Sequence, residues 1–66
     1  MQEPFADATL VPGAFVRLPA APEWGKGQVQ SVDGSRVTVN FEERGKVTVD
    51  LRHARLELVE PARPPR

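Results

Sequence analysis

The most regular part of the chain is a pair of segments in which apolar and polar residues alternate. The segments "RVTVNFE" (36–42) and "KVTVDLR" (46–52) both follow this pattern, and the first places Val37, Val39 and Phe41 on one face. Strict alternation with a period of two is typical of a β-strand that buries one face. The second segment likewise turns Val47, Val49 and Leu51 inward. These two segments therefore predict adjacent strands over one core.

Three further segments have the composition of short strands: "AFVRL" (14–18), "KGQVQSV" (26–32) and "ARLELVE" (54–60). Gly, Pro, Asp and Ser cluster between the five segments and mark turns. In the last segment we expect Leu56, together with Leu58 or Val59, to be buried. Five short strands separated by turns predict an all-β fold, either a small barrel or a sandwich.

The register of the second hairpin follows from turn chemistry and burial together. A three-residue loop, Glu43-Arg44-Gly45, places glycine where a type I turn with a G1 bulge needs a left-handed residue. Partners across a hairpin point to the same face, so all apolar residues then meet apolar ones. The predicted pairs are Phe41 with Val47, Val39 with Val49, Val37 with Leu51, and Glu42 with Lys46.

The first hairpin leaves two registers open. A two-residue loop, Asp33-Gly34, is typical of type I′ turns, but it pairs Val39 with Gln28. A three-residue loop, Asp33-Gly34-Ser35, pairs Val39 with Val29, and a slip of one residue exchanges the two faces. Burial favours the longer loop, which also pairs Val37 with Ser31 and Phe41 with Gly27.

The segment "PEWGKG" (22–27) holds the only tryptophan of the chain. Gly27 falls opposite Phe41, where a side chain would collide, and Gly25 lets the backbone bend into the strand. The segment is therefore interpreted as a corner, with Trp24 as a lid over one end of the core. The other interpretation keeps Trp24 partly exposed as an anchor for a partner, since tryptophan is enriched in binding hot spots. Both interpretations are compatible.

The chain of 66 residues is long enough for one domain. We expect a flexible N-terminal arm over 1–11 and the folded part over 12–59, with Phe5 and Leu10 as the residues of the arm that could dock. The segment "EPARPPR" (60–66) contains three prolines, which cannot join a sheet interior. It is therefore expected to form a disordered tail.

Charge and composition narrow the class of protein. Nine basic and nine acidic residues cancel, whereas nucleic-acid binders carry a basic excess. No apolar run is long enough to span a membrane, and the N-terminus lacks the basic region of a signal peptide. The chain has no cysteine, which fits a reducing compartment. We therefore expect a soluble, cytoplasmic protein.

The residues that most catalytic and metal sites need are scarce. His53 is the only histidine, and there is no cysteine, so neither a nucleophile–base pair nor a set of metal ligands is present. One Trp, three Phe and no Tyr cannot form an aromatic cage for a methylated lysine. We predict no enzymatic activity, no metal and no cofactor.

The segment from Pro12 to Leu51 resembles a small bacterial family of unknown function that is common in alphaproteobacteria. The pattern consists of a Pro-Gly, a strand, a Pro-Glu-Trp-Gly loop, Gly-Gln-Val-Gln-Ser and a Val-x-Val-x-Phe strand, and the match extends over roughly 12–59. The resemblance implies an SH3-like or Tudor-like barrel. The matching positions are Pro12, Gly13, Val16, Pro22, Trp24, Gly25, Gly27, Val29, Val39, Phe41 and Gly45.

A more distant resemblance connects the chain with the C-terminal Tudor-like module of UvrD-type helicases. It extends to the polymerase-interacting barrels of CarD-like transcription factors and of the transcription-repair coupling factor. Those modules share aromatic-Gly-x-Gly-x-Val, seen here from Trp24 to Val29, and a Gly-Lys turn, seen here at Gly45. Leu18 stands where those modules have a histidine. The resemblance implies a partner such as RNA polymerase or a repair factor.

These observations predict a monomeric, non-catalytic protein-interaction module of the transcription or DNA-repair machinery. Trp24, Lys26 and Arg17 form the expected contact patch, and an open sheet edge offers another way to bind a partner. The same edge could instead pair two copies of the chain. The alternative function is weak, sequence-independent nucleic-acid binding through phosphates. That alternative would use Arg17, Lys26, Arg36, Arg52 and Arg55.

Overall fold

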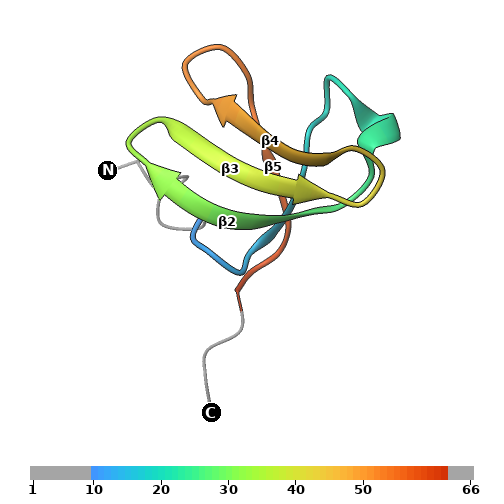
Figure 1. Cartoon of the computed structure of the whole chain (residues 1–66), viewed down its shortest axis with the longest axis horizontal. Coiled ribbons are helices and arrows are strands. Elements are labelled where there is room, and N and C mark those ends of the chain that lie inside the picture. The colour runs from blue at the N-terminus through green and yellow to red at the C-terminus, as the bar shows by residue number, and fades with distance from the viewer. Residues whose placement is uncertain (1–9, 63–66) are drawn as a thin grey trace.

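All five predicted strands are present in the computed structural model, which describes residues 10–62 (Figure 1). A single-turn 3-10 helix, η1 (Pro22–Trp24), lies between the first two strands. The expected all-β class is confirmed. Most of the predicted N-terminal arm and C-terminal tail lies outside the described residues. The strands are β1 (Phe15–Arg17), β2 (Gly27–Asp33), β3 (Arg36–Phe41), β4 (Gly45–Asp50) and β5 (Glu57–Glu60).

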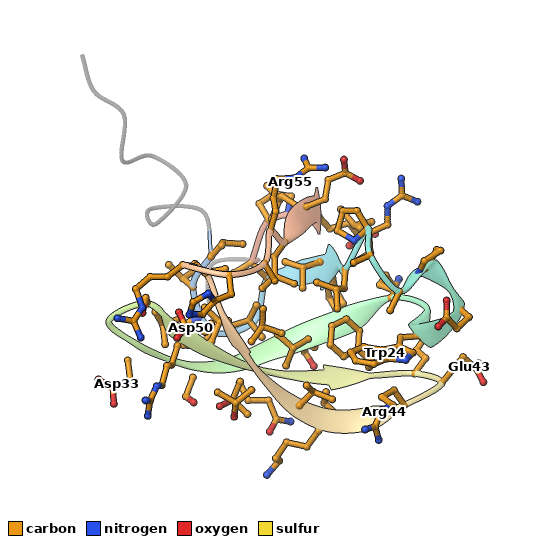
Figure 2. The ribbon with its side chains drawn as sticks, turned by 90° about the horizontal axis from the view of Figure 1, so that it is seen from above. Trp24, Asp33, Glu43, Arg44, Asp50 and Arg55 are labelled. Atoms are coloured by element: carbon orange, nitrogen blue, oxygen red, sulfur yellow. The ribbon has the colours of Figure 1, made fainter. Side chains whose placement is uncertain are left out.

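The strands form one antiparallel sheet in the order β4-β3-β2-β1-β5. Figure 1 shows β2, β3 and β4 running side by side as a curved meander. β1 joins the meander through β2 and carries β5 on its other side. The sheet curls, so that apolar side chains fill the space between the meander and the β1–β5 pair (Figure 2). β4 and β5 are therefore the two edges of the sheet.

The core consists of the inward face that the alternation predicts. Val37 and Val39 are fully buried and Phe41 is 2% exposed, because successive side chains of a strand point to opposite faces. The expectation for the last strand was wrong in part: Leu56 is buried, but Leu58 and Val59 are 38% and 45% exposed. Leu56 closes the core just before β5 begins, and β5 itself is an edge. The other buried apolar residues are Leu10, Ala14, Val16, Leu18, Ala21, Val29 and Val49.

The packed part of the chain is longer than the predicted range of 12–59. Leu10 is only 5% exposed and belongs to the core, and Ala62 packs against the core from the other terminus. Glu60, which was assigned to the tail, is the last residue of β5. The core therefore extends from Leu10 to Ala62.

The predicted register of the second hairpin was wrong by two residues. Phe41 pairs with Gly45, and the loop is Glu42-Glu43-Arg44. The Arg44 N–H donates to the Phe41 carbonyl at 3.3 Å, and Gly45 follows with φ +90°. A shift of two residues keeps every side chain on its face, so the hydrophobic pattern alone could not exclude it. The pairs are Val39 with Val47, Val37 with Val49, and Lys46 with Asn40 rather than Glu42.

The predicted register of the first hairpin holds only at its core end, which is the end farthest from the turn. Gly27 pairs with Phe41 and Val29 with Val39, as expected, but Gln30 is an extra residue at a register shift. Beyond this bulge Val37 pairs with Val32 rather than Ser31, and Asp33 pairs with Arg36. The loop is therefore Gly34-Ser35. One bulged residue reconciles burial at the core end with a two-residue turn at the tip.

The two glycines of "WGKG" have the roles that were predicted for them. Gly25 has φ +78° and ψ −163°, a conformation that is essentially restricted to glycine. A Cβ on Gly27 would come within 2.7 Å of Phe41 Cδ1 and would also collide with Val39 Cγ1. The segment is therefore a corner of the sheet, and its second glycine allows close approach to the core.

Candidate interaction surface

Trp24 covers the end of the core beside the β3–β4 turn. Its indole lies edge to face against Phe41, with ring centroids 5.3 Å apart, and Arg44 Cζ is 5.2 Å from the indole centroid. The Glu43 N–H donates to the Trp24 carbonyl at 2.9 Å, which ties the corner to the turn. Figure 2 shows Trp24, Glu43 and Arg44 at the same end of the molecule. Trp24 therefore lies where the lid interpretation places it, and this residue is half-buried.

Arg17 and Lys26 lie on the outer surface of the sheet. Lys26 Nζ is 4.8 Å from the centroid of the Phe15 ring, and Arg17 Nε donates to Glu57 Oε1 at 2.8 Å. The antiparallel β1–β2 register pairs Val16 with Gly27, so its continuation places Arg17 beside Lys26. The structure thus brings two members of the predicted patch together, whereas the third, Trp24, packs against the core.

The basic residues of the nucleic-acid alternative are spread over the molecule. Arg36, the first residue of β3, is the cross-strand neighbour of Asp50. Arg52 binds the carboxylate of Asp50. Figure 2 shows Asp50 and Trp24 at opposite ends, with Arg55 on another side. The structure therefore does not gather Arg17, Lys26, Arg36, Arg52 and Arg55 on one surface.

Asp50 and Arg52 form an ion pair at the end of β4. Arg52 Nη2 lies 2.9 Å from Asp50 Oδ2, Arg52 Nε lies 3.2 Å from Oδ1, and the Arg52 backbone N–H donates to Oδ1 at 3.0 Å. These hydrogen bonds favour the ionised carboxylate and hold the pKa of Asp50 well below its ordinary value of 3.8. The pair fixes the start of the β4–β5 connection.

The β5 edge carries two of the exposed large apolar side chains of residues 10–62. Leu58 and Val59 are adjacent, and each is more than a third exposed. Glu57 and Glu60 flank them, and Pro61 follows the strand. This surface was not predicted, because one of the two apolar residues was expected in the core. The signal was the "ELVE" run, where two adjacent apolar residues break the alternation.

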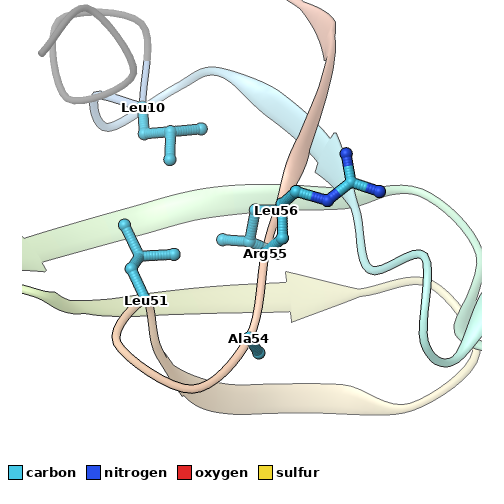
Figure 3. A pocket seen from close by; sticks show the side chains of 5 residues that line it. All are labelled: Leu10, Leu51, Ala54, Arg55 and Leu56. Atoms are coloured by element: carbon cyan, nitrogen blue, oxygen red, sulfur yellow. The ribbon is translucent and has the colours of Figure 1, made fainter. Parts of the chain in front are cut away.

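A small apolar pocket lies beside the start of β5 (Figure 3). Its volume is about 310 Å³. The pocket was not predicted, because Leu10 and the other lining residues are distant in the sequence. The lining combines residues from both ends of the chain: Leu10, Leu51, Ala54, Arg55 and Leu56.

No group of three or more His, Cys, Asp or Glu side chains within residues 10–62 is placed to hold a metal ion. The same part of the chain contains no helix that is long and apolar enough to cross a membrane.

Fold and surface together define a small all-β module with an apolar sheet edge. Residues 10–59 match the family described as "Protein of unknown function (DUF3553)", so the chain belongs to this family. The expected membership in a family of unknown function is thereby confirmed. No curated protein and no solved structure shows a significant match.

Proposed function

We propose that the chain is a non-catalytic module that binds another protein, and that the partner adds a strand to the β5 edge. The observation that carries this proposal is the exposure of Leu58 and Val59 on a strand with only one neighbour, β1. An edge strand presents unpaired N–H and C=O groups that another chain can use. Main-chain hydrogen bonds then supply affinity, and side-chain contacts supply specificity.

The other edge, β4, is a poorer acceptor. Its exposed side chains are polar, with Lys46 and Thr48 pointing outward. Lysine on an edge strand hinders pairing with another chain. The Thr48 hydroxyl is already within 3.2 Å of the Thr38 hydroxyl of β3. The apolar surface that a partner would cover is therefore on β5.

Arg17 borders the proposed edge, and Lys26 lies on the far side of β1 from β5. Arg17 lies on β1 beside β5 and holds Glu57 at 2.8 Å, so it orients a side chain of the accepting strand. Lys26 packs over Phe15 on the same outer face. Of the three residues expected to contact the partner, Arg17 is the one that lies next to β5. Trp24 supports the corner that precedes β2.

The identity of the partner is proposed from the resemblance to Tudor-like modules of bacterial transcription and repair proteins. The strand order β4-β3-β2-β1-β5, with a curved meander and β5 returning beside β1, supports an SH3-like or Tudor-like barrel. The proposed partner is therefore a cytoplasmic protein of that machinery, such as RNA polymerase or a repair factor.

The test is to select linear peptides from a displayed random library against the full chain and to map their binding by amide NMR. We expect the selected peptides to shift the amide resonances of Glu57–Glu60. Leu58→Lys should weaken binding by about ten-fold or more, because the lost burial of a leucine is worth about 1.5 kcal/mol or more.

Val32→Lys is the matched control. Val32 is 39% exposed and Leu58 is 38% exposed, but Val32 lies on β2, an interior strand of the sheet. Equal losses of binding in the two variants would contradict the β5 site. A parallel titration with duplex DNA tests the alternative: salt-sensitive shifts at Arg17, Lys26, Arg36, Arg52 and Arg55 would support phosphate binding.

A further inference from the structure

The apolar pocket beside β5 adjoins the proposed strand-accepting edge. Leu56, which lines it, is the residue directly before Glu57, the first residue of β5. A strand advances about 3.3 Å per residue, so a partner segment that extends one or two residues beyond Glu57 reaches the pocket. At about 310 Å³, the pocket lies at the small end of the range for ligand sites, about 300–1,000 Å³. One large side chain is therefore a suitable occupant.

The lining combines apolar surface with a single charged residue. Leu51, Ala54 and Leu56 supply carbon surface, and Arg55 is the charged member (Figure 3). Figure 3 shows the guanidinium of Arg55 extending away from Leu51 and Ala54, at the side of the pocket. An arginine in this position attracts a carboxylate outside the pocket and leaves the apolar interior for a hydrocarbon side chain.

Within residues 10–62, Arg55 forms neither an ion pair with a carboxylate nor a contact with an aromatic ring. Arg17 and Arg52 form ion pairs of 2.8 and 2.9 Å with Glu57 and Asp50. Arg44 lies over the ring of Trp24, and Arg36 is the cross-strand neighbour of Asp50. No carboxylate in the described part of the chain lies within ion-pair distance of Arg55. Its charge is therefore available to a carboxylate of a partner.

We infer that this pocket binds one large apolar side chain of the partner while Arg55 pairs with a carboxylate next to that side chain. The inference rests on the proposed function, because the side chain that enters the pocket belongs to the partner segment that pairs with β5. It adds a requirement for the sequence of the partner. An acidic residue must stand next to a leucine-like residue, at the end of the partner segment that extends beyond Glu57.

Two short peptides test this requirement on the full chain. Both are acetylated and amidated, and one carries Asp-Leu where the other carries Asn-Leu. Binding is followed through the methyl resonances of Leu10, Leu51 and Leu56. The Asp peptide should bind about 1.5- to 5-fold more tightly, the range expected of an exposed ion pair. Arg55→Gln should abolish the difference between the peptides.

Arg52→Gln is the matched control, because it removes an arginine that already has an intramolecular partner; it should preserve the preference for Asp. Equal affinity of the two peptides for the unmodified chain would overturn the inference. So would nuclear Overhauser contacts between Phe5 and these leucine methyl groups in the free protein, since the chain would then fill the pocket itself.

The two proposals fail in different ways. Selected peptides that shift β5 amides but leave the three leucine methyl groups unchanged would overturn the pocket and retain the β5 edge. Binding that is insensitive to Leu58→Lys, together with a preference for Asp that depends on Arg55, would support the pocket and contradict strand addition.

Discussion

The indole of Trp24 meets the ring of Phe41 edge to face, with centroids 5.3 Å apart and ring planes at 61°. Edge-to-face contact aligns the positive edge of one ring with the negative face of the other. Phe41 is also the residue against which Gly27 packs. The corner and the end of β3 therefore share one side chain, and damage to either contact should destabilise the same end of the sheet.

Trp24→Ala should lower the free energy of unfolding by about 2 kcal/mol. The value is below the about 3–5 kcal/mol typical of a fully buried aromatic residue, because this indole is half-buried. Trp24→Phe should retain most of the stability. Urea denaturation followed by circular dichroism measures both. Arg44→Ala is the control and should lose less than about 1 kcal/mol. A Trp24→Ala variant as stable as the original chain would contradict the lid.

Gly27→Ala should destabilise the fold by about 1–3 kcal/mol, because the new methyl group overpacks the core against Phe41 and Val39. Gly27→Val should prevent folding, which the loss of dispersed amide resonances would report. Gln28→Ala, on the neighbouring exposed position, should change stability by less than about 0.5 kcal/mol. Normal folding of the valine variant would mean that Gly27 does not face the core.

Acid should remove the stabilisation contributed by Asp50 and Arg52. The folded-state pKa of Asp50 is depressed below the ordinary value of 3.8 by hydrogen bonds from Arg52. This contribution is therefore complete above pH 3.8 and is lost as pH falls toward the lower folded-state pKa. Urea midpoints measured from about pH 5 to about pH 2 should fall less steeply for Asp50→Asn. Arg52→Gln should act in the same direction, and Arg55→Gln should leave the slope unchanged.

The bulge at Gln30 should appear in amide hydrogen exchange. An extra residue in a strand is left out of the ladder, so the Gln30 amide should exchange faster than that of Val29. The Val29 N–H donates to the Ala14 carbonyl at 2.8 Å and serves as the protected reference within the same strand. Equal protection of the two amides would indicate a regular hairpin without the bulge.

The sequence by itself determined which face of each central strand is buried. Val37, Val39 and Phe41 are in the core as the alternation predicts, because the pleat turns successive side chains to opposite sides. It also determined the corner, since Gly27 opposite Phe41 follows from matching apolar residues across the hairpin. Local patterns suffice where burial on one face is the only constraint.

Tertiary structure decided the register of the second hairpin and the bulge in the first. A shift of two residues preserves the faces, so the choice depended on contacts with another segment. The Glu42 and Glu43 N–H groups donate to the carbonyls of Lys26 and Trp24, each at 2.9 Å. These hydrogen bonds join the β3–β4 turn to the corner, which lies elsewhere in the sequence.

The surfaces available to a partner were likewise decided only by the fold. Leu58 and Val59 are exposed because β5 pairs with β1 alone, although leucine and valine side chains are apolar and favour burial. The pocket brings Leu10 beside Leu51 and Leu56, and Arg17 pairs with Glu57 across 40 positions of sequence. Alternation reports how a strand divides its own side chains between two faces. Which strand becomes an edge depends on pairing between segments distant in the chain, and local periodicity does not encode that pairing.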